Sequence, residues 1–153
     1  MIIVSDTSAI TSLLQIHQEH ILAELYQEVI VPTEVANELL KYHRMLPGFI
    51  KVLSITDRTR FDRLRAELDL GEAAAITLML EGKGDLLLMD ERRGRSVAMR
   101  ENLPVIGLIG VLLEARKKKR IPSLADAIEQ LERTADFRIS PRLKARAIAA
   151  AGE

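Results

Sequence analysis

Near its N-terminal end the chain reads Ile2-Ile3-Val4-Ser5-Asp6-Thr7-Ser8, a short apolar run that stops on a carboxylate. A second stretch repeats the pattern, since Leu86-Leu87-Leu88-Met89 stops at Asp90-Glu91. Continuous apolar runs of this length are typical of strands buried on both faces of a parallel sheet. Residues just past the carboxyl ends of such strands line the ligand crevice of an open α/β sheet. The two acids therefore predict an anionic pocket, for which a hard divalent cation is the natural occupant.

Length and composition limit the kinds of site that the chain can carry. Its 153 residues are 48% apolar, which is enough to bury a hydrophobic core without disulfide or metal cross-links. Cysteine is absent, which excludes disulfides and thiolate metal sites. Lys plus Arg and Asp plus Glu both number 22, so attraction to nucleic acid must come from local clusters. With no signal-peptide pattern and no apolar run near the roughly 18 residues of a membrane helix, we expect a cytoplasmic protein without membrane association.

Strand and helix patterns alternate along the whole chain, which is typical of an α/β fold with a parallel sheet. The predicted strands lie near 2–5, 29–31, 49–55, 85–89 and 104–106, and the predicted helices near 8–16, 21–26, 33–42, 57–67, 72–80, 91–101, 108–119, 123–133 and from 141 onward. We see no repeat or linker. We therefore expect one domain over residues 1–153 with a short sheet of four or five strands and a C-terminal helical tail over about 122–153.

Four acids stand out by their positions in this pattern: Asp6, Glu38, Glu72 and Asp90. Asp6 and Asp90 follow strands, Glu38 lies in the helix after the second strand, and Glu72 lies in the first turn of a helix that we expect to begin at Gly71. Mg²⁺ and Mn²⁺ take oxygen ligands and keep several waters, so a few carboxylates around one crevice suffice. Such a cluster suits phosphodiester hydrolysis.

Each of these acids also has a purely structural interpretation. Asp6 and Asp90 could cap the helices that follow them, because Asp is a preferred N-cap residue. Glu72 could stabilise a helix N-terminus from the first turn, and Glu38 could be an ordinary residue on a helix face. The functional interpretation therefore depends on the combination of the four.

Five short segments carry a family resemblance, and they occur in order from residue 2 to about 120. They are Ile3-Val4-Ser5-Asp6-Thr7-Ser8, Val31-Pro32-x-x-Val35-x-x-Glu38-Leu39, Leu70-Gly71-Glu72-Ala73-x-Ala75-Ile76, Asp90-Glu91-x-x-Gly94-Arg95 and Val105-Ile106-Gly107-x-x-Gly110-Val111-Leu112, the last followed by Ala115-Arg116-Lys117. Further matches lie in the tail at Asp136-Phe137-Arg138-Ile139-Ser140. No single segment is specific, but the set in this order resembles PIN-domain ribonucleases, and more closely a poorly characterised VapC-like branch of that superfamily.

The resemblance implies a three-layer α/β/α fold and a metal-dependent endoribonuclease that leaves a 5′-phosphate and a 3′-hydroxyl. Carried over residue by residue, the catalytic and Mg²⁺- or Mn²⁺-binding acids are the same four, Asp6, Glu38, Glu72 and Asp90. The hydroxyls of Thr7 and Ser8 would support the first acid, and Glu91 is a further ligand or a spectator. Relatives often act as toxins of toxin–antitoxin pairs, so the implied partners are RNA, a cognate antitoxin and a second copy of the chain in a homodimer.

Three positions depart from the family pattern. Glu72 and Glu91 stand where many PIN domains carry Asp, and Leu108 replaces a small polar residue that we expect after Ile106-Gly107. Glutamate reaches one methylene further, which alters the geometry of any ligation. An alternative therefore stays open, in which the chain is a catalytically weak or inactive PIN-like module that binds RNA or an antitoxin.

Basic residues near the predicted site give a candidate RNA contact. Arg92, Arg93 and Arg95 directly follow the second acidic stretch and could hold the RNA backbone through its phosphates. A solvated helix face is the alternative for these arginines. The basic run 116–120 lies where cations favour a helix C-terminus, which explains it without nucleic acid. With only three Phe and two Tyr, the usual platforms for base stacking are not expected.

Other catalytic patterns fit poorly. Haloacid-dehalogenase-type phosphatases begin similarly with Asp-x-Asp after a strand, but Ser8 replaces the second acid here and leaves that chemistry without its general acid. We find no Ser/His/Asp arrangement, and Gly82-Lys83-Gly84 is too short for a phosphate-binding loop.

Overall fold

Five apolar segments pair into one fully parallel sheet in the computed structural model, which describes residues 1–153. The strands are β1 (Ile2–Ser5), β2 (Glu28–Pro32), β3 (Ile50–Leu53), β4 (Leu86–Leu88) and β5 (Val105–Ile106). Their order across the sheet is β3-β2-β1-β4-β5. The predicted parallel sheet is thus confirmed, with five strands.

The order of the strands reverses beside β1. From β1 the chain moves outward through β2 to β3, and then returns to β4 on the other side of β1. Ile3 of β1 pairs with Val29 on one side and with Leu86 on the other. In open α/β sheets, ligands bind at such a reversal, beyond the carboxyl ends of the strands. The fold therefore directs attention to the residues that follow β1 and β4.

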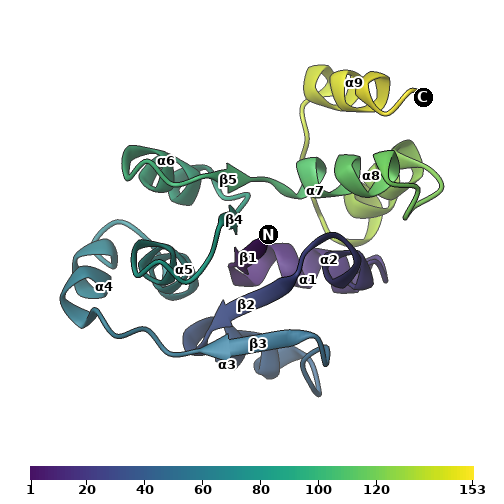
Figure 1. Ribbon diagram of the computed structural model, residues 1–153. Coiled ribbons are helices and arrows are strands. Elements are labelled where there is room, and N and C mark those ends of the chain that lie inside the picture. Colours follow the sequence, from purple (N-terminus) through teal and green to yellow (C-terminus); the bar gives the residue numbers. More distant parts are fainter.

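Nine helices cover the two faces of the sheet (Figure 1). They are α1 (Thr7–Gln15), α2 (His20–Leu25), α3 (Thr33–Tyr42), α4 (Arg58–Leu64), α5 (Leu70–Leu80), α6 (Arg92–Arg100), α7 (Leu108–Lys117), α8 (Leu124–Thr134) and α9 (Pro141–Ala150). Alternate strand residues point to opposite faces, so Ile3 and its neighbour Val4 belong to two different cores. The core of Ile3 includes residues of α1, α2, α3, α7, α8 and α9, and the core of Val4 includes residues of α4, α5 and α6. This is the predicted three-layer α/β/α architecture. None of the helices combines the length and the apolar character needed to cross a membrane.

The start of α5 differs from the prediction in a way that matters for the site. Helix α4 ends at Leu64, and α5 begins at Leu70 with Asp69 as its N-cap. Gly71, expected to precede the helix or open it, lies inside the first turn. The Asp69 side chain accepts a hydrogen bond from the backbone N–H of Glu72, and the Glu72 side chain accepts one from the backbone N–H of Asp69. This reciprocal capping box fixes both carboxylates at one helix N-terminus.

The C-terminal part of the chain packs onto the face that carries α1 and α7. Leu124, Ile128 and Leu131 of α8 are buried in the same core as α1, and Ala147 of α9 joins them. Helix α9 begins at Pro141 with Ser140 as its cap, as predicted from proline's preference for the first helical position. The connection 135–140 runs between these two helices and places α9 above α7 (Figure 1).

Candidate active site at the carboxyl ends of the strands

Five carboxylates line one cavity of about 660 Å³ beyond the carboxyl ends of the strands, and they belong to Asp6, Glu38, Asp69, Glu72 and Glu91. Three of the four predicted acids are therefore brought together. The fourth, Asp90, lines a neighbouring cavity of about 1030 Å³, and Glu91 lines both. The charge of Asp90 nevertheless acts on Asp6. The charges of Glu72 and Asp90 thus both act on Asp6, and Glu38 lines the same cavity as Asp6 and Glu72.

Asp6 is the most deeply buried of these acids. It follows β1 directly, is 2% exposed, and its backbone N–H donates to the Leu88 carbonyl of β4 at 3.4 Å. One carboxylate oxygen accepts from Ala9 N–H at 3.3 Å, so Asp6 does cap α1, and the other accepts from the Ser8 hydroxyl at 3.4 Å. Burial is the main reason why the pKa of Asp6 is raised to about 8. The negative charges of nearby Asp90, Glu72 and Asp69 raise it further. The residue is both a structural cap and an uncompensated acid.

Asp90 is held by a helix distant in sequence. The prediction that it could cap the following helix is wrong, because Glu91 occupies the N-cap position of α6. Both oxygens of Asp90 instead accept from Leu108 N–H at the start of α7, at 3.0 and 3.1 Å. A Cβ at Gly107 would lie 3.0 Å from Asp90 Oδ1, so this close approach needs glycine. The expected polar residue at position 108 is unnecessary for this contact, since the backbone supplies it and the Leu108 side chain is buried.

Glu72 and Asp69 enter the cavity together from the capping box of α5. The hydrogen bond to Asp69 Oδ1 is 2.8 Å and the one to Glu72 Oε1 is 3.2 Å. Glu72 is 6% exposed, and burial raises the pKa of its carboxyl. The structural interpretation of Glu72 as a first-turn acid is confirmed, and it also faces the cavity. Asp69 was missed by the sequence reasoning, although the Asp-x-x-Glu spacing of a capping box signals it.

Glu38 reaches the cavity from the second turn of α3. Its Oε1 and the neighbouring Thr7 Oγ1 are buried and form no hydrogen bond of good geometry. The Thr7 hydroxyl and the Gly71 N–H nevertheless lie close enough to Glu38 to lower the pKa of its carboxyl, which opposes the effect of burial. A Cβ at Gly71 would lie 2.9 Å from that Oε1 and 3.1 Å from that Oγ1, so glycine leaves room for both. Burial raises the pKa of Glu38, and the charge of Asp69 adds to the effect. Two buried oxygens that the protein itself satisfies poorly are compatible with a bound donor or cation at this place.

The chemistry of these donors fits a hydrated divalent cation. No three acidic or histidine side chains converge closely enough to enclose an ion by direct contact alone. Mg²⁺ is usually bound through one or two carboxylates and keeps several waters, so wider spacing is compatible with it. A bound cation would favour the charged form of Asp6, whose pKa burial raises to about 8, and would provide a partner for the buried Oε1 of Glu38.

The three predicted RNA-contacting arginines occupy different surroundings. Arg93 lines the acidic cavity and donates to the Glu67 carbonyl at 3.0 Å. Arg95 is half-buried, donates to the Met89 carbonyl at 3.0 Å, and lies beside Asp90. Burial raises the pKa of Asp90, and the charge of Arg95 partly opposes this rise. Arg92 is exposed and lines neither cavity. Arg93 is therefore the arginine placed to meet a ligand at the acids.

Comparison with known families identifies the family of the chain. The sequence model of the family described as DUF3368, PIN domain, matches residues 2–153. The match includes the C-terminal helices α8 and α9, which lie beyond the segments that carried the resemblance. No curated protein matches the sequence.

Proposed function

This chain belongs to the PIN-domain family, whose fold is of the nuclease type, and we propose that it is a Mg²⁺- or Mn²⁺-dependent endoribonuclease. One observation carries the proposal: Asp6 is buried at the strand-order reversal, and the charges of Asp69, Glu72 and Asp90 oppose its ionisation. PIN domains are generally hydrolases that use divalent metals, and the donor set of this cavity agrees with that chemistry.

Asp6, Glu38, Glu72 and Asp90 are the acids that would hold a hydrated cation, one or two of them by direct contact and the others through its waters. Glu91 is a further acid, which lines both cavities. A divalent cation would lower the pKa of a bound water, and it would neutralise charge on the phosphate and the leaving oxygen.

The protein's own contribution is to fix the acids before substrate arrives. Helix N-termini orient three of them, since Asp6 accepts from α1, Glu72 belongs to the capping box of α5, and Asp90 accepts from α7. The hydroxyl of Ser8 contacts Asp6, and that of Thr7 lies unpaired near Glu38.

The RNA backbone would meet Arg93 first, because this arginine lines the acidic cavity. A guanidinium there can contact a phosphate oxygen and so fix the position of the scissile bond. Arg95 would act on the substrate through Asp90, which it lies beside. Arg92 would reach only RNA that extends over the exposed surface of α6.

The proposed biological role is that of a VapC-like toxin with a cognate antitoxin and a homodimeric state, as the family resemblance implies. Toxicity on expression that is relieved by the product of a neighbouring gene would support this role. Expression without toxicity would leave the nuclease proposal intact and remove the toxin role.

Cleavage of a labelled structured RNA by the purified protein tests the nuclease. The assay compares the wild type with Mn²⁺, the wild type with EDTA, and the Asp6→Asn variant with Mn²⁺. Asp62→Asn is a matched control, because Asp62 is exposed on α4 and lines neither cavity. We expect cleavage by the wild type and by Asp62→Asn with Mn²⁺, and loss of cleavage in the other two reactions.

A contaminating ribonuclease would survive the Asp6→Asn substitution, which is why the variant matters more than EDTA. Cleavage that persists in the variant, or no cleavage by a folded wild-type protein, contradicts the proposal. Either result favours a PIN-like module that binds RNA or an antitoxin without cleaving.

A further inference from the structure

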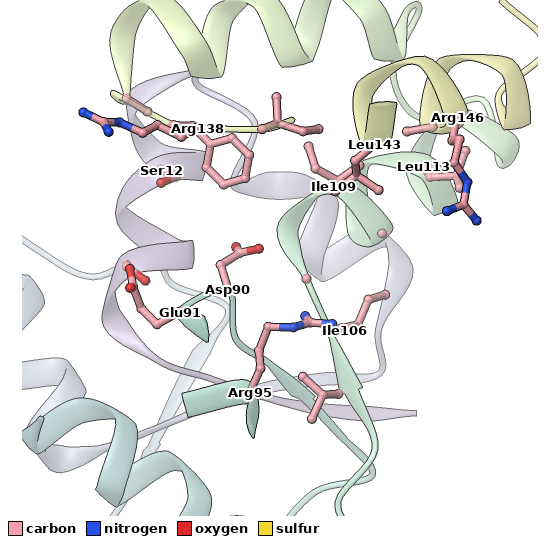
Figure 2. A pocket seen from close by; sticks show the side chains of 18 of the residues that line it. Ser12, Asp90, Glu91, Arg95, Ile106, Ile109, Leu113, Arg138, Leu143 and Arg146 are labelled. Carbon is pink, nitrogen blue, oxygen red and sulfur yellow. The ribbon is translucent and has the colours of Figure 1, made fainter. Parts of the chain in front are cut away.

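The larger cavity, about 1030 Å³, lies beside the acids and is closed on its far side by the C-terminal part of the chain. Figure 2 shows Asp90 and Glu91 on one side of it and Arg138, Leu143 and Arg146 on the opposite side. It shares Ser8, Ser12, Glu91 and Ala135 with the acidic cavity. The two cavities therefore adjoin at these residues, and a linear ligand at the acids could extend from one cavity into the larger one.

Two cations on the C-terminal side of this cavity have no partner in the protein. Arg138 lies in the connection before α9 and Arg146 lies on α9, and both are exposed and line the cavity. Neither forms a hydrogen bond or ion pair, whereas the nearby Lys144 and Arg133 pair with Glu132 and Glu129 respectively. Unpaired guanidiniums facing a cavity are available for an anionic ligand.

The space between these cations is apolar. Ile109 of α7 and Leu143 of α9 line it from facing helices, and Leu143 is 48% exposed. Phe137 is the one aromatic residue of the lining, and it also packs against the core. A flat aromatic face beside aliphatic side chains suits an unstacked base, whose stacking on an aromatic ring is worth about 1–3 kcal/mol.

We propose that this cavity, between α7 and α9, is a subsite for nucleotides that flank the cleavage position of single-stranded RNA. In this subsite Arg138 and Arg146 contact phosphates, and Phe137, Ile109 and Leu143 receive a base. The inference rests on the proposed function, because it takes the acids as the point where the RNA is cut. The subsite requires the flanking nucleotides to be unpaired, since a base in an apolar cavity must be free of a duplex.

The distribution of charge favours RNA over a polypeptide as the occupant. Carboxylates of Asp90 and Glu91 lie at the end that joins the acids, and Asp136 lies at the rim. The two free guanidiniums lie at the opposite side. An RNA strand matches this arrangement along its length. The phosphate at the cleavage position would meet a cation at the acids, and the next phosphates would meet Arg138 and Arg146.

Binding measurements test the subsite apart from cleavage. The probe is a fluorescent, unstructured oligoribonucleotide of about ten nucleotides, which spans a typical single-strand site. The variant Arg138→Gln/Arg146→Gln is made in the Asp6→Asn background, and its Kd is followed by anisotropy across a salt series. The control Arg133→Gln/Arg142→Gln removes the same charge from exposed positions that line neither cavity.

We expect the Arg138→Gln/Arg146→Gln protein to bind about tenfold more weakly at low salt. The slope of log Kd against log salt should fall by about 1.4, because each phosphate contact on a single strand contributes about 0.7. The control should keep the slope of the parent protein. Equal melting temperatures would exclude a folding defect, which is not expected because neither arginine has a partner.

Cleavage of a dinucleotide separates the subsite from the proposed function. A dinucleotide occupies the acids without reaching the larger cavity, so the double variant in the otherwise wild-type chain should cleave it normally and cleave the longer RNA more slowly. If no protein cleaves any RNA but binding depends on Arg138 and Arg146, the nuclease proposal fails, and the cavity is shown to bind single-stranded RNA without a cleavage position beside it.

A Kd and salt slope that match those of the control overturn the subsite, whatever the cleavage assay gives. The cavity would then be left to a polypeptide partner. Equal loss of dinucleotide and long-RNA cleavage would also overturn it, because the arginines would then act at the acids themselves.

Discussion

Asp6 and Glu153 both present a carboxylate to a helix N-terminus, and their surroundings drive their pKa values in opposite directions. Glu153 accepts from Leu124 N–H, Ala125 N–H and the Ser123 hydroxyl at the start of α8, at 2.7, 3.1 and 2.9 Å, and from Arg116 Nε at 3.1 Å. These donors lower the pKa of Glu153 to about 2. Asp6 has two long hydrogen bonds, is buried, and has a pKa raised to about 8.

The contrast separates a carboxylate that holds structure from one that is kept for a ligand. Glu153 stabilises its charged form with four donors and ties the end of the chain to α7 and α8. Asp6 lies among acids, and its charged form gains little from the protein itself. A buried carboxylate in such surroundings is typical of a functional site, where a bound ligand from outside the chain stabilises its negative charge.

The largest expected effect is that of Asp6→Asn on the response to metal. Mn²⁺ should raise the melting temperature of the wild type by about 5–10 °C at a hundredfold excess over Kd, since such binding contributes about 2.7 kcal/mol. Asp6→Asn should lose this shift. In EDTA at neutral pH it should melt above the wild type, because it removes a carboxyl whose raised pKa costs folding free energy above the unfolded pKa of 3.8. Differential scanning fluorimetry with and without Mn²⁺ measures both.

Asp62→Asn, which alters an exposed acid, should keep the full Mn²⁺ shift. A wild-type protein that melts at the same temperature with Mn²⁺ as with EDTA would remove the contrast between the two carboxylates.

Gly71→Ala should separate the site from the stability of the fold. The added Cβ would lie 2.9 Å from Glu38 Oε1, so the Glu38 side chain must move. We expect cleavage to fall about tenfold, the lower range for a disturbed ligand shell. Stability should hold, because alanine favours a helix over glycine by up to about 1 kcal/mol.

Gly48→Ala is the matched control for this substitution, because nothing lies within 4 Å of a Cβ at that position. Circular dichroism melts and the RNA-cleavage rate of both variants measure the result. A Gly71→Ala protein that cleaves like the wild type would show that Glu38 has no part in the site.

The sequence predicted the sheet and most of the acids because both depend on local patterns. The apolar runs that became β1 and β4 end on Asp6 and Asp90, and their parallel pairing brought these acids to one edge. Asp69 was missed for a local reason, because the helix was expected to begin at Gly71 when its cap lies two residues earlier.

Other features could not be predicted because they depend on contacts between distant segments. The hydrogen bonds from Leu108 N–H to Asp90 join residues 18 apart. The larger cavity exists only because the connection 135–140 and α9 fold back over α7. No periodicity or motif in the tail specifies that packing.

Asp69→Asn should have a smaller effect than the substitutions above. Asparagine caps a helix about as well as aspartate, so the capping box of α5 should persist while one negative charge leaves the cavity. Because Asp69 is exposed, we expect the Kd for Mn²⁺ to rise no more than about fivefold, equivalent to about 1 kcal/mol.

Asp69→Ala provides the comparison, since it removes the cap as well and should lower stability by about 1 kcal/mol. Mn²⁺ titrations followed by thermal shift, with urea unfolding in EDTA, separate the two effects. Equal urea stability of the two variants would mean that the cap contributes nothing at this helix.

Glu153→Gln should leave dinucleotide cleavage and the Mn²⁺ shift unchanged, because Glu153 lies in neither cavity. The effect of the substitution should be confined to stability and should depend on pH.

The pKa of Glu153 lies below its ordinary value of 4.5. The stability that the charged Glu153 contributes is therefore complete above about pH 4.5 and is lost as the pH falls towards 2. The wild type should therefore melt above Glu153→Gln at neutral pH, and the gap should close in acid. A gap that stays constant as the pH falls would mean that the charge of Glu153 does not hold the C-terminus, and the two carboxylates would then differ only in burial.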